Sequence, residues 1–130
     1  MTILVAYVPR PEGLAALDKA IEIATNNKER LVVVNAGPGG RQEDANIVNG
    51  YEVERVEERL ATLPIEAEFK QFVRGNSAIE EIEDMVDALQ VSLLVIGLRK
   101  RSPVGKLLLG SMAQEILLTV PCPVLAVKAN

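Results

Sequence analysis

The feature that most constrains this chain is the alternation of short apolar runs with amphipathic segments. Nearly continuous apolar runs occupy residues 3–8, 31–34, 91–96 and 124–127, while residues 66–73 alternate between polar and apolar side chains. Runs of this length that contain β-branched residues and are bounded by turn formers are typical of buried strands. The pattern predicts five strands separated by four other elements.

The segments between the runs carry apolar residues at spacings of three and four, the period of a helix with one buried face. The apolar positions that indicate the four helices are Leu14, Leu17, Ile21 and Ala24; Val53, Val56 and Leu60; Ile79, Ile82, Val86 and Leu89; and Met112, Ala113, Ile116, Leu117 and Val120. Residues 26–28 are expected to end the first helix, and Ser77 with Glu80 forms a capping-box pattern at the start of the third. The polar segment 41–49 fits neither period.

Strands and helices in alternation predict a single α/β domain over residues 1–130, with an open parallel five-stranded sheet and helices on both faces. In such a sheet, ligands bind outside the carboxyl ends of the strands, where the winding direction reverses. The last strand, 124–127, is expected at a sheet edge, where it could pair with a second copy of the chain.

Composition excludes several classes of function. The formal net charge of −4 disfavours a nucleic-acid binder, because duplex phosphates require a basic face. The absence of histidine removes the usual acid/base partner of a nucleophile and the commonest transition-metal ligand. A single cysteine, Cys122, excludes an internal disulfide, and the apolar runs are too short for a membrane helix. We therefore expect a cytoplasmic protein that has no catalytic or metal-ligating residues and no membrane partner.

A cationic segment, residues 97–111, follows the fourth predicted strand. It contains no acidic residue, and its basic residues are Arg99, Lys100, Arg101 and Lys106. A loop of this kind before a helix can hold an anion, because backbone N–H groups and the helix dipole favour negative charge. Gly97 and Gly110 would let the backbone approach phosphate oxygens, and Ser111 could donate its hydroxyl to one.

Over its whole length the chain resembles the universal stress protein family. The nucleotide motif of that family is Gly, two residues, Gly, nine residues, Gly, then Ser or Thr. Gly97, Gly110 and Ser111 match it, whereas Lys100 replaces the second Gly. The family's sequences are also similar at LLVIG (93–97), LLLGS (107–111) and PCPVLAVK (121–128). The resemblance implies a Rossmann-like fold of the adenine nucleotide alpha hydrolase-like type, and homodimers, which we expect to form through the C-terminal strand.

The resemblance further implies binding of an adenine nucleotide (ATP, ADP or AMP), with Mg²⁺ as a conceivable companion, in a stress-response or regulatory role. The phosphates would contact Gly97, Arg99, Lys100, Gly110 and Ser111. The base would lie near Asn35, just after the second strand. It would also lie near Val8 and Pro9, where nucleotide-binding members commonly carry Asp. Without His or that Asp, we expect binding more than turnover, with slow ATP hydrolysis at most.

Other interpretations of these residues stay open. Ser111 with Gln114 satisfies the capping-box pattern and could simply cap its helix, Gly110 could serve a tight turn, and the basic residues could form a solvated loop. The competing functional hypothesis is a dimeric interaction module of the same fold that binds no nucleotide. A third hypothesis, an enzyme acting on a phosphorylated substrate, shares the anion loop but lacks visible catalytic residues.

Overall fold

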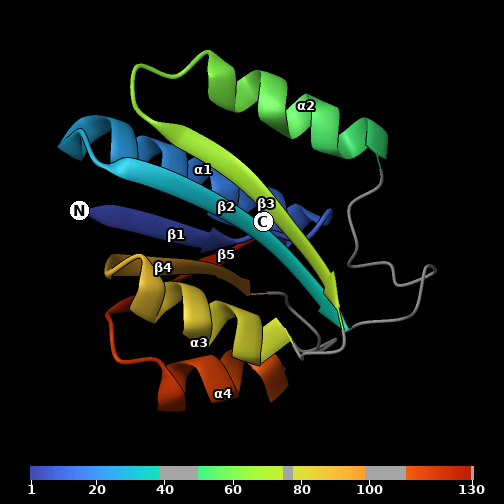
Figure 1. Ribbon diagram of the computed structural model, residues 1–130, viewed down its shortest axis with the longest axis vertical. Coiled ribbons are helices and arrows are strands. Elements are labelled where there is room, and N and C mark those ends of the chain that lie inside the picture. The colour runs from blue at the N-terminus through green and yellow to red at the C-terminus, as the bar shows by residue number, and fades with distance from the viewer. Residues whose placement is uncertain (39–49, 75–77, 99–110, 130) are drawn as a thin grey trace.

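The computed structural model describes residues 1–38, 50–74, 78–98 and 111–129. Within these ranges the chain forms five strands and four helices in the predicted alternating order (Figure 1). In chain order they are β1 (Thr2–Ala6), α1 (Pro11–Asn27), β2 (Arg30–Pro38), α2 (Gly50–Ala61), β3 (Ala67–Arg74), α3 (Ala78–Ala88), β4 (Val91–Leu98), α4 (Ser111–Thr119) and β5 (Val124–Lys128). The segment 41–49 and the predicted capping residue Ser77 lie outside the described residues.

The five strands pair in parallel in the order β3-β2-β1-β4-β5, which confirms the predicted fold class. β1 is the central strand, and its residues Ile3, Leu4 and Val5 are completely buried. A strand covered on both faces needs apolar side chains at every position, which is why the runs are continuous. β5 lies at one edge of the sheet, as the sequence predicts, and β3 lies at the other.

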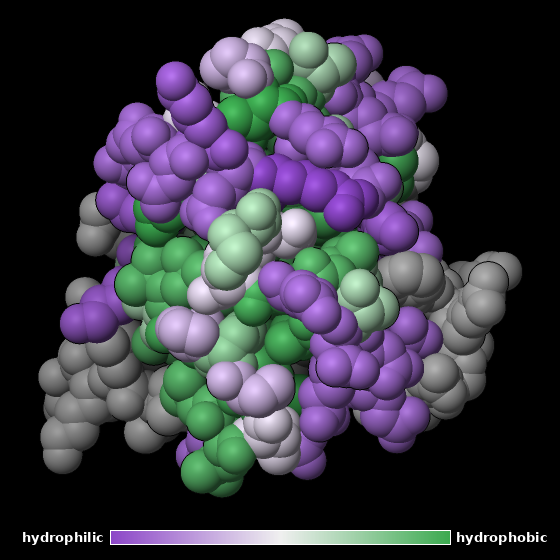
Figure 2. All heavy atoms as spheres, turned by 60° about the vertical axis from the view of Figure 1, so that its left-hand side comes forward, coloured by the Kyte–Doolittle hydropathy of each residue, from purple (hydrophilic) through white to green (hydrophobic). Residues whose placement is uncertain are grey.

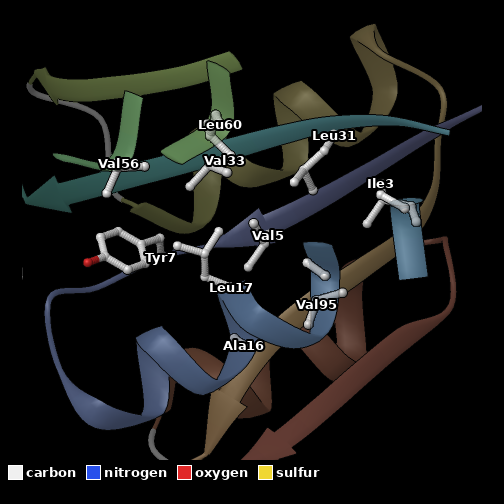
Figure 3. Close-up of a cluster of buried hydrophobic side chains, with 12 residues drawn as sticks. Ile3, Val5, Tyr7, Ala16, Leu17, Leu31, Val33, Val56, Leu60 and Val95 are labelled. Carbon is white, nitrogen blue, oxygen red and sulfur yellow. The ribbon is translucent and has the colours of Figure 1, made fainter. Parts of the chain in front are cut away.

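Helices cover both faces of the sheet and enclose two apolar clusters. Alternate residues of β1 point to opposite faces, so Ile3 and Val5 enter the first cluster and Leu4 enters the second. Tyr7, just after the strand, also belongs to the first cluster. The first cluster, drawn in Figure 3, joins β1 and β2 to α1 and α2. The second cluster joins the sheet to α3 and α4, mainly through Ile82, Met85, Val86 and Ile116.

The predicted buried face of the first helix is wrong at Leu14, whose side chain is 46% exposed. The apolar residues that α1 buries are Ala16, Leu17, Ala20 and Ala24. A mostly alanine face lets the helix backbone approach the sheet closely, and this rotates the longer Leu14 toward the solvent. Leu117 of α4 is similarly 44% exposed, whereas Ile116 is buried.

Two strands extend beyond the apolar runs that predicted them. β2 pairs with β3 as far as Pro38 opposite Arg74, and β4 pairs with β5 as far as Leu98 opposite Lys128. The ends of these strands are set by hydrogen bonding to a neighbouring strand, which apolar content does not report. As a result, Asn35 and Gly97 lie inside strands and not in the loops that follow them.

Candidate functional site

The candidate site lies at the carboxyl edge of the sheet, where the winding of the chain reverses. β1 has β2 on one side and β4 on the other. The helix that follows β1 packs in the first cluster, and the helix that follows β4 packs in the second, on the opposite face. A crevice between two strands whose connections diverge in this way is the usual ligand site of an open α/β sheet.

Two glycines allow three segments to meet at this edge of the sheet. A Cβ atom on Gly13, in the first turn of α1, would stand 1.8 Å from the backbone oxygen of Val8. A Cβ atom on Gly97, in β4, would stand 2.2 Å from the backbone oxygen of Glu12 and 2.6 Å from its carbonyl carbon. The residues after β1, the first turn of α1 and the end of β4 are therefore in direct backbone contact, which a residue with a Cβ atom would prevent.

Gly97 belongs to β4, so the prediction that it opens the cationic loop is wrong: β4 continues through Leu98. The strand is longer than its apolar run because Gly97 and Leu98 still pair with Val127 and Lys128 of β5. The contact with Glu12 also gives Gly97 a packing role that requires no ligand. Its contact with a phosphate stays a prediction.

A compact turn joins β1 to α1 and contains Val8 and Pro9, both half-buried. The Arg10 N–H donates a hydrogen bond to the Val8 carbonyl at 2.8 Å. The helix then begins at Pro11, and the extended Arg10 provides no side-chain cap. Because first-turn N–H groups lack intrahelical acceptors, the amino end of α1 carries partial positive charge beside Gly97.

Asn35 is the polar residue at the centre of this edge, and its side chain is completely buried. Its Nδ2 atom donates to the backbone oxygen of Tyr7 at 2.9 Å, and its Oδ1 atom accepts from Nε2 of Gln71 at 3.1 Å. The Tyr7 N–H in turn donates to the Val34 carbonyl at 2.8 Å. Asn35 therefore ties β1 to β2 and β3 where the turn to α1 begins. The prediction that Asn35 follows the second strand is wrong, because Asn35 lies inside β2, and its contact with a base stays a prediction.

The remaining predicted phosphate contacts can be located only in part. Ser111 is the first residue of α4, whereas Arg99, Lys100 and Gly110 lie outside the described residues. Within the described ranges, no group of three or more His, Cys, Asp or Glu side chains could hold a metal ion. Across the same ranges, none of the helices has the length and apolar character needed to cross a membrane.

A concave feature that the sequence did not predict lies over Tyr7 between α1 and α2. We call it the Tyr7 cleft. It measures about 380 Å³ and is lined by Tyr7, Pro9, Leu14, Leu17, Glu52, Arg55, Val56 and Arg59. Burial, and then the nearby Glu52 carboxylate, raise the pKa of the Tyr7 phenol above its ordinary value of 10.0. The only sequence signal for the cleft is a tyrosine within an otherwise aliphatic run.

The fold and this edge define a doubly wound α/β domain with its candidate ligand site at the switch point between β1 and β4. A sequence model of the universal stress protein family matches residues 1–128. A universal stress protein of Mycolicibacterium smegmatis is 45% identical over 128 residues, which cover 98% of each chain. This chain therefore belongs to the universal stress protein family.

Solved structures agree with that assignment. A universal stress protein from Archaeoglobus fulgidus superimposes with a TM-score of 0.79 at 28% identity, covering 98% of this chain and 97% of the other. A second structure from A. fulgidus, a universal stress protein in complex with dAMP, gives a TM-score of 0.73 at 22% identity, covering 98% and 96%. The first structure is similar to this chain in both sequence and fold. The second, at lower identity, is similar in fold.

Proposed function

We propose that this chain binds an adenine nucleotide, ATP or AMP, at the carboxyl edge between β1 and β4, and that it serves a regulatory or stress-response role in the cytoplasm. The observation that carries the proposal is the backbone contact between Gly97 and Glu12, which sets the amino end of α1 beside the end of β4. Backbone N–H groups at a switch point favour a phosphorylated ligand. The dAMP bound to the A. fulgidus relative supports the adenine nucleotide class.

The proposed contacts divide between the two ends of the nucleotide. The phosphates would lie toward Gly97 and Ser111 and toward the residues that connect them, Arg99, Lys100 and Gly110. The base would lie toward Val8 and Pro9. Asn35 acts indirectly, because its side chain already bonds Tyr7 and Gln71 and thereby fixes the turn that holds Val8 and Pro9.

Glu12 adds a negative charge that a phosphate must tolerate. Its side chain is buried, and its backbone packs on Gly97. Since like charges repel strongly where water is excluded, we expect Mg²⁺ to strengthen ATP binding by offsetting the charge of Glu12 and of the phosphates. Glu12→Gln should then reduce the dependence of ATP affinity on Mg²⁺.

The test is calorimetric titration of the purified chain with ATP, with and without Mg²⁺, repeated on Gly110→Val. We expect micromolar binding to the parent and loss of binding in the variant, because a bulky side chain would block the loop backbone. Gly50→Val is the matched control, since a Cβ atom on Gly50 meets nothing within 4 Å. Absence of heat and of any thermal shift at millimolar ATP would disprove the proposal, and unchanged binding by Gly110→Val would move the site elsewhere.

Turnover is measured in the same samples by release of inorganic phosphate. We expect slow hydrolysis at most, because the chain contains no His and the position after β1 that commonly carries Asp in nucleotide-binding members is Val8. Titration with ADP and AMP ranks the ligands. A loss of affinity as phosphates are removed would support their proposed contact with the loop.

A dimeric interaction module is the second candidate, favoured by the position of β5. This strand is a sheet edge, and its residues 124–127 are only half-buried. Leu118 of the adjoining α4 is 84% exposed. Figure 2 shows that one face of the molecule carries apolar surface, in green, below a band of hydrophilic side chains, in purple. An apolar edge strand of this kind can pair with the same strand of a second copy.

Proline substitutions separate edge pairing from folding. The Leu94 N–H donates to the Pro123 carbonyl and the Ala129 N–H donates to the Leu98 carbonyl, so odd-numbered residues of β5 face β4. The N–H of Ala126 therefore points to the open edge. Ala126→Pro should turn a dimer into a folded monomer in analytical ultracentrifugation, whereas Leu125→Pro should destabilise the fold itself. A parent chain that stays monomeric at high concentration would refute the dimer.

A further inference from the structure

Glu12 places a buried carboxylate at the carboxyl edge of the sheet. Among the described residues it alone is a buried acidic residue, with 9% of its surface exposed. Its carboxylate forms no hydrogen bond or ion pair with another described residue. Its oxygens are also not among the polar atoms that are sealed inside the fold without a partner. They are therefore open to the hydrogen-bond donors of a ligand.

Backbone contacts place Glu12 between the two ends of the proposed nucleotide site. Gly13, the next residue, packs on the carbonyl of Val8, and Gly97 packs on Glu12 itself. The Cβ atom of Glu12 stands 3.0 Å from the position that a Cβ atom on Gly97 would take, so the Glu12 side chain starts against the end of β4. The base is proposed to lie toward Val8 and the phosphates toward Gly97, with Glu12 between them.

The order of groups in a nucleotide decides which of them meets Glu12. The sugar joins the base to the phosphates, so a nucleotide that runs from Val8 to Gly97 brings its sugar to Glu12. A carboxylate accepts hydrogen bonds, and the two hydroxyl groups of ribose can donate them. A phosphate in the same position would be repelled, because like charges interact strongly where water is excluded. The sugar is therefore the part of a nucleotide that suits this residue.

We propose that Glu12 recognises the ribose of the bound nucleotide, so that the site prefers adenine ribonucleotides to 2′-deoxyribonucleotides. The inference rests on the proposed function, because it requires a nucleotide at this edge. The carboxylate accepts hydrogen bonds from the ribose hydroxyls, and such bonds are stronger than those to a neutral acceptor. The partial positive charge at the amino end of α1 offsets the cost of burying the carboxylate.

A purely structural role for Glu12 makes a different prediction. A carboxylate in the first turn stabilises a helix through its dipole, so loss of that effect would weaken the binding of AMP and of 2′-deoxy-AMP alike. The ratio of the two affinities isolates the contact with the sugar. Because both nucleotides carry the same phosphate, a change in its repulsion by Glu12 cancels in the ratio.

The experiment is calorimetric titration of the parent and of Glu12→Gln with AMP and with 2′-deoxy-AMP, in the absence of Mg²⁺. We expect the parent to bind AMP about tenfold more tightly than 2′-deoxy-AMP. The preference should fall to about threefold or less in Glu12→Gln, because an amide oxygen is the weaker acceptor. Glu12→Asp keeps the negative charge at the helix end but withdraws it by one methylene, so it should retain the fold and lose the preference.

Glu22→Gln is the matched control. It removes an exposed carboxylate from the same helix, where Glu22 pairs with Lys19, and should leave the ratio unchanged. Equal binding of AMP and 2′-deoxy-AMP by the parent would overturn the inference, as would an undiminished preference in Glu12→Gln and Glu12→Asp. If the parent binds neither nucleotide, the proposed nucleotide site itself is disproved and this inference with it, so the two failures are distinguishable.

Discussion

Gly97 packs so closely on Glu12 that a Cβ atom on Gly97 would stand 2.2 Å from the Glu12 backbone oxygen. The atom it would meet belongs to the backbone, which cannot rotate away as a flexible side chain can. This contact fixes the distance between the first turn of α1 and the end of β4. The family's glycine motif therefore begins at a residue that the fold requires in its own right.

Gly97→Ala should lower the free energy of unfolding by about 1–3 kcal/mol, because the helix and the strand must move apart to admit the methyl group. Gly50→Ala is the control, because a Cβ atom there meets nothing within 4 Å. We expect it to be neutral or to stabilise by up to about 1 kcal/mol. Urea denaturation of both variants measures the difference, and equal stabilities would contradict the packing role of Gly97.

Asn35→Ala should lower the free energy of unfolding by about 1–3 kcal/mol, because it leaves the Tyr7 carbonyl without the Asn35 donor in a buried position. Gln71→Ala removes a hydrogen bond from a half-buried residue at an edge strand and should cost less. Chemical denaturation ranks the two variants. A larger loss in Gln71→Ala would contradict the assignment of Asn35 as the residue that ties β1 to β2.

Tyr7 should make the fold sensitive to alkaline pH. Burial raises the pKa of its phenol in the folded state, so above the ordinary pKa of 10.0 the unfolded chain loses this proton before the folded chain does. The stability from this group is complete below pH 10 and falls as the pH rises further. Tyr7→Phe should flatten this fall in urea denaturation between pH 9 and 11.

The titration of Cys122 would also contribute to the loss of stability in that measurement, so its contribution must be removed. Burial also raises the pKa of its thiol above the ordinary value of 9.0, so it weakens the fold from pH 9 upward. The comparison is therefore made in a Cys122→Ala background. If Tyr7→Phe and its parent lose stability equally between pH 10 and 11 in that background, the phenol is not responsible.

Lys28→Gly should stabilise the chain by about 0.5–1 kcal/mol. Lys28 ends α1 in the left-handed conformation, with φ 56° and ψ 45°, and its N–H contacts the carbonyls of the last helical turn. A side chain disfavours this conformation, whereas glycine adopts it freely. Thermal unfolding measures the change, with Lys28→Ala as a control that should change little. A lower melting temperature for Lys28→Gly would contradict this reasoning.

Sequence reasoning succeeded where one local pattern dominates. The apolar runs predicted the parallel sheet because central strands are buried on both faces, and the end of α1 at residues 26–28 is confirmed. It failed at Leu14, because the helical spacing of the large apolar residues did not reveal that the alanines of α1 face the sheet. It also ended β2 before Asn35, since a buried amide inside a strand is satisfied by partners 28 and 36 positions away.

The sequence by itself determined the order of the elements, the parallel sheet with its edge at β5, and membership of the universal stress protein family. These depend on hydrophobic period and on motif residues, both of which are local in the chain. Only the tertiary structure decided which face α1 buries, why Gly97 must lack a side chain, and that a cleft lies over Tyr7 between α1 and α2. Each of these depends on contacts between segments distant in sequence, and a local pattern carries no record of them.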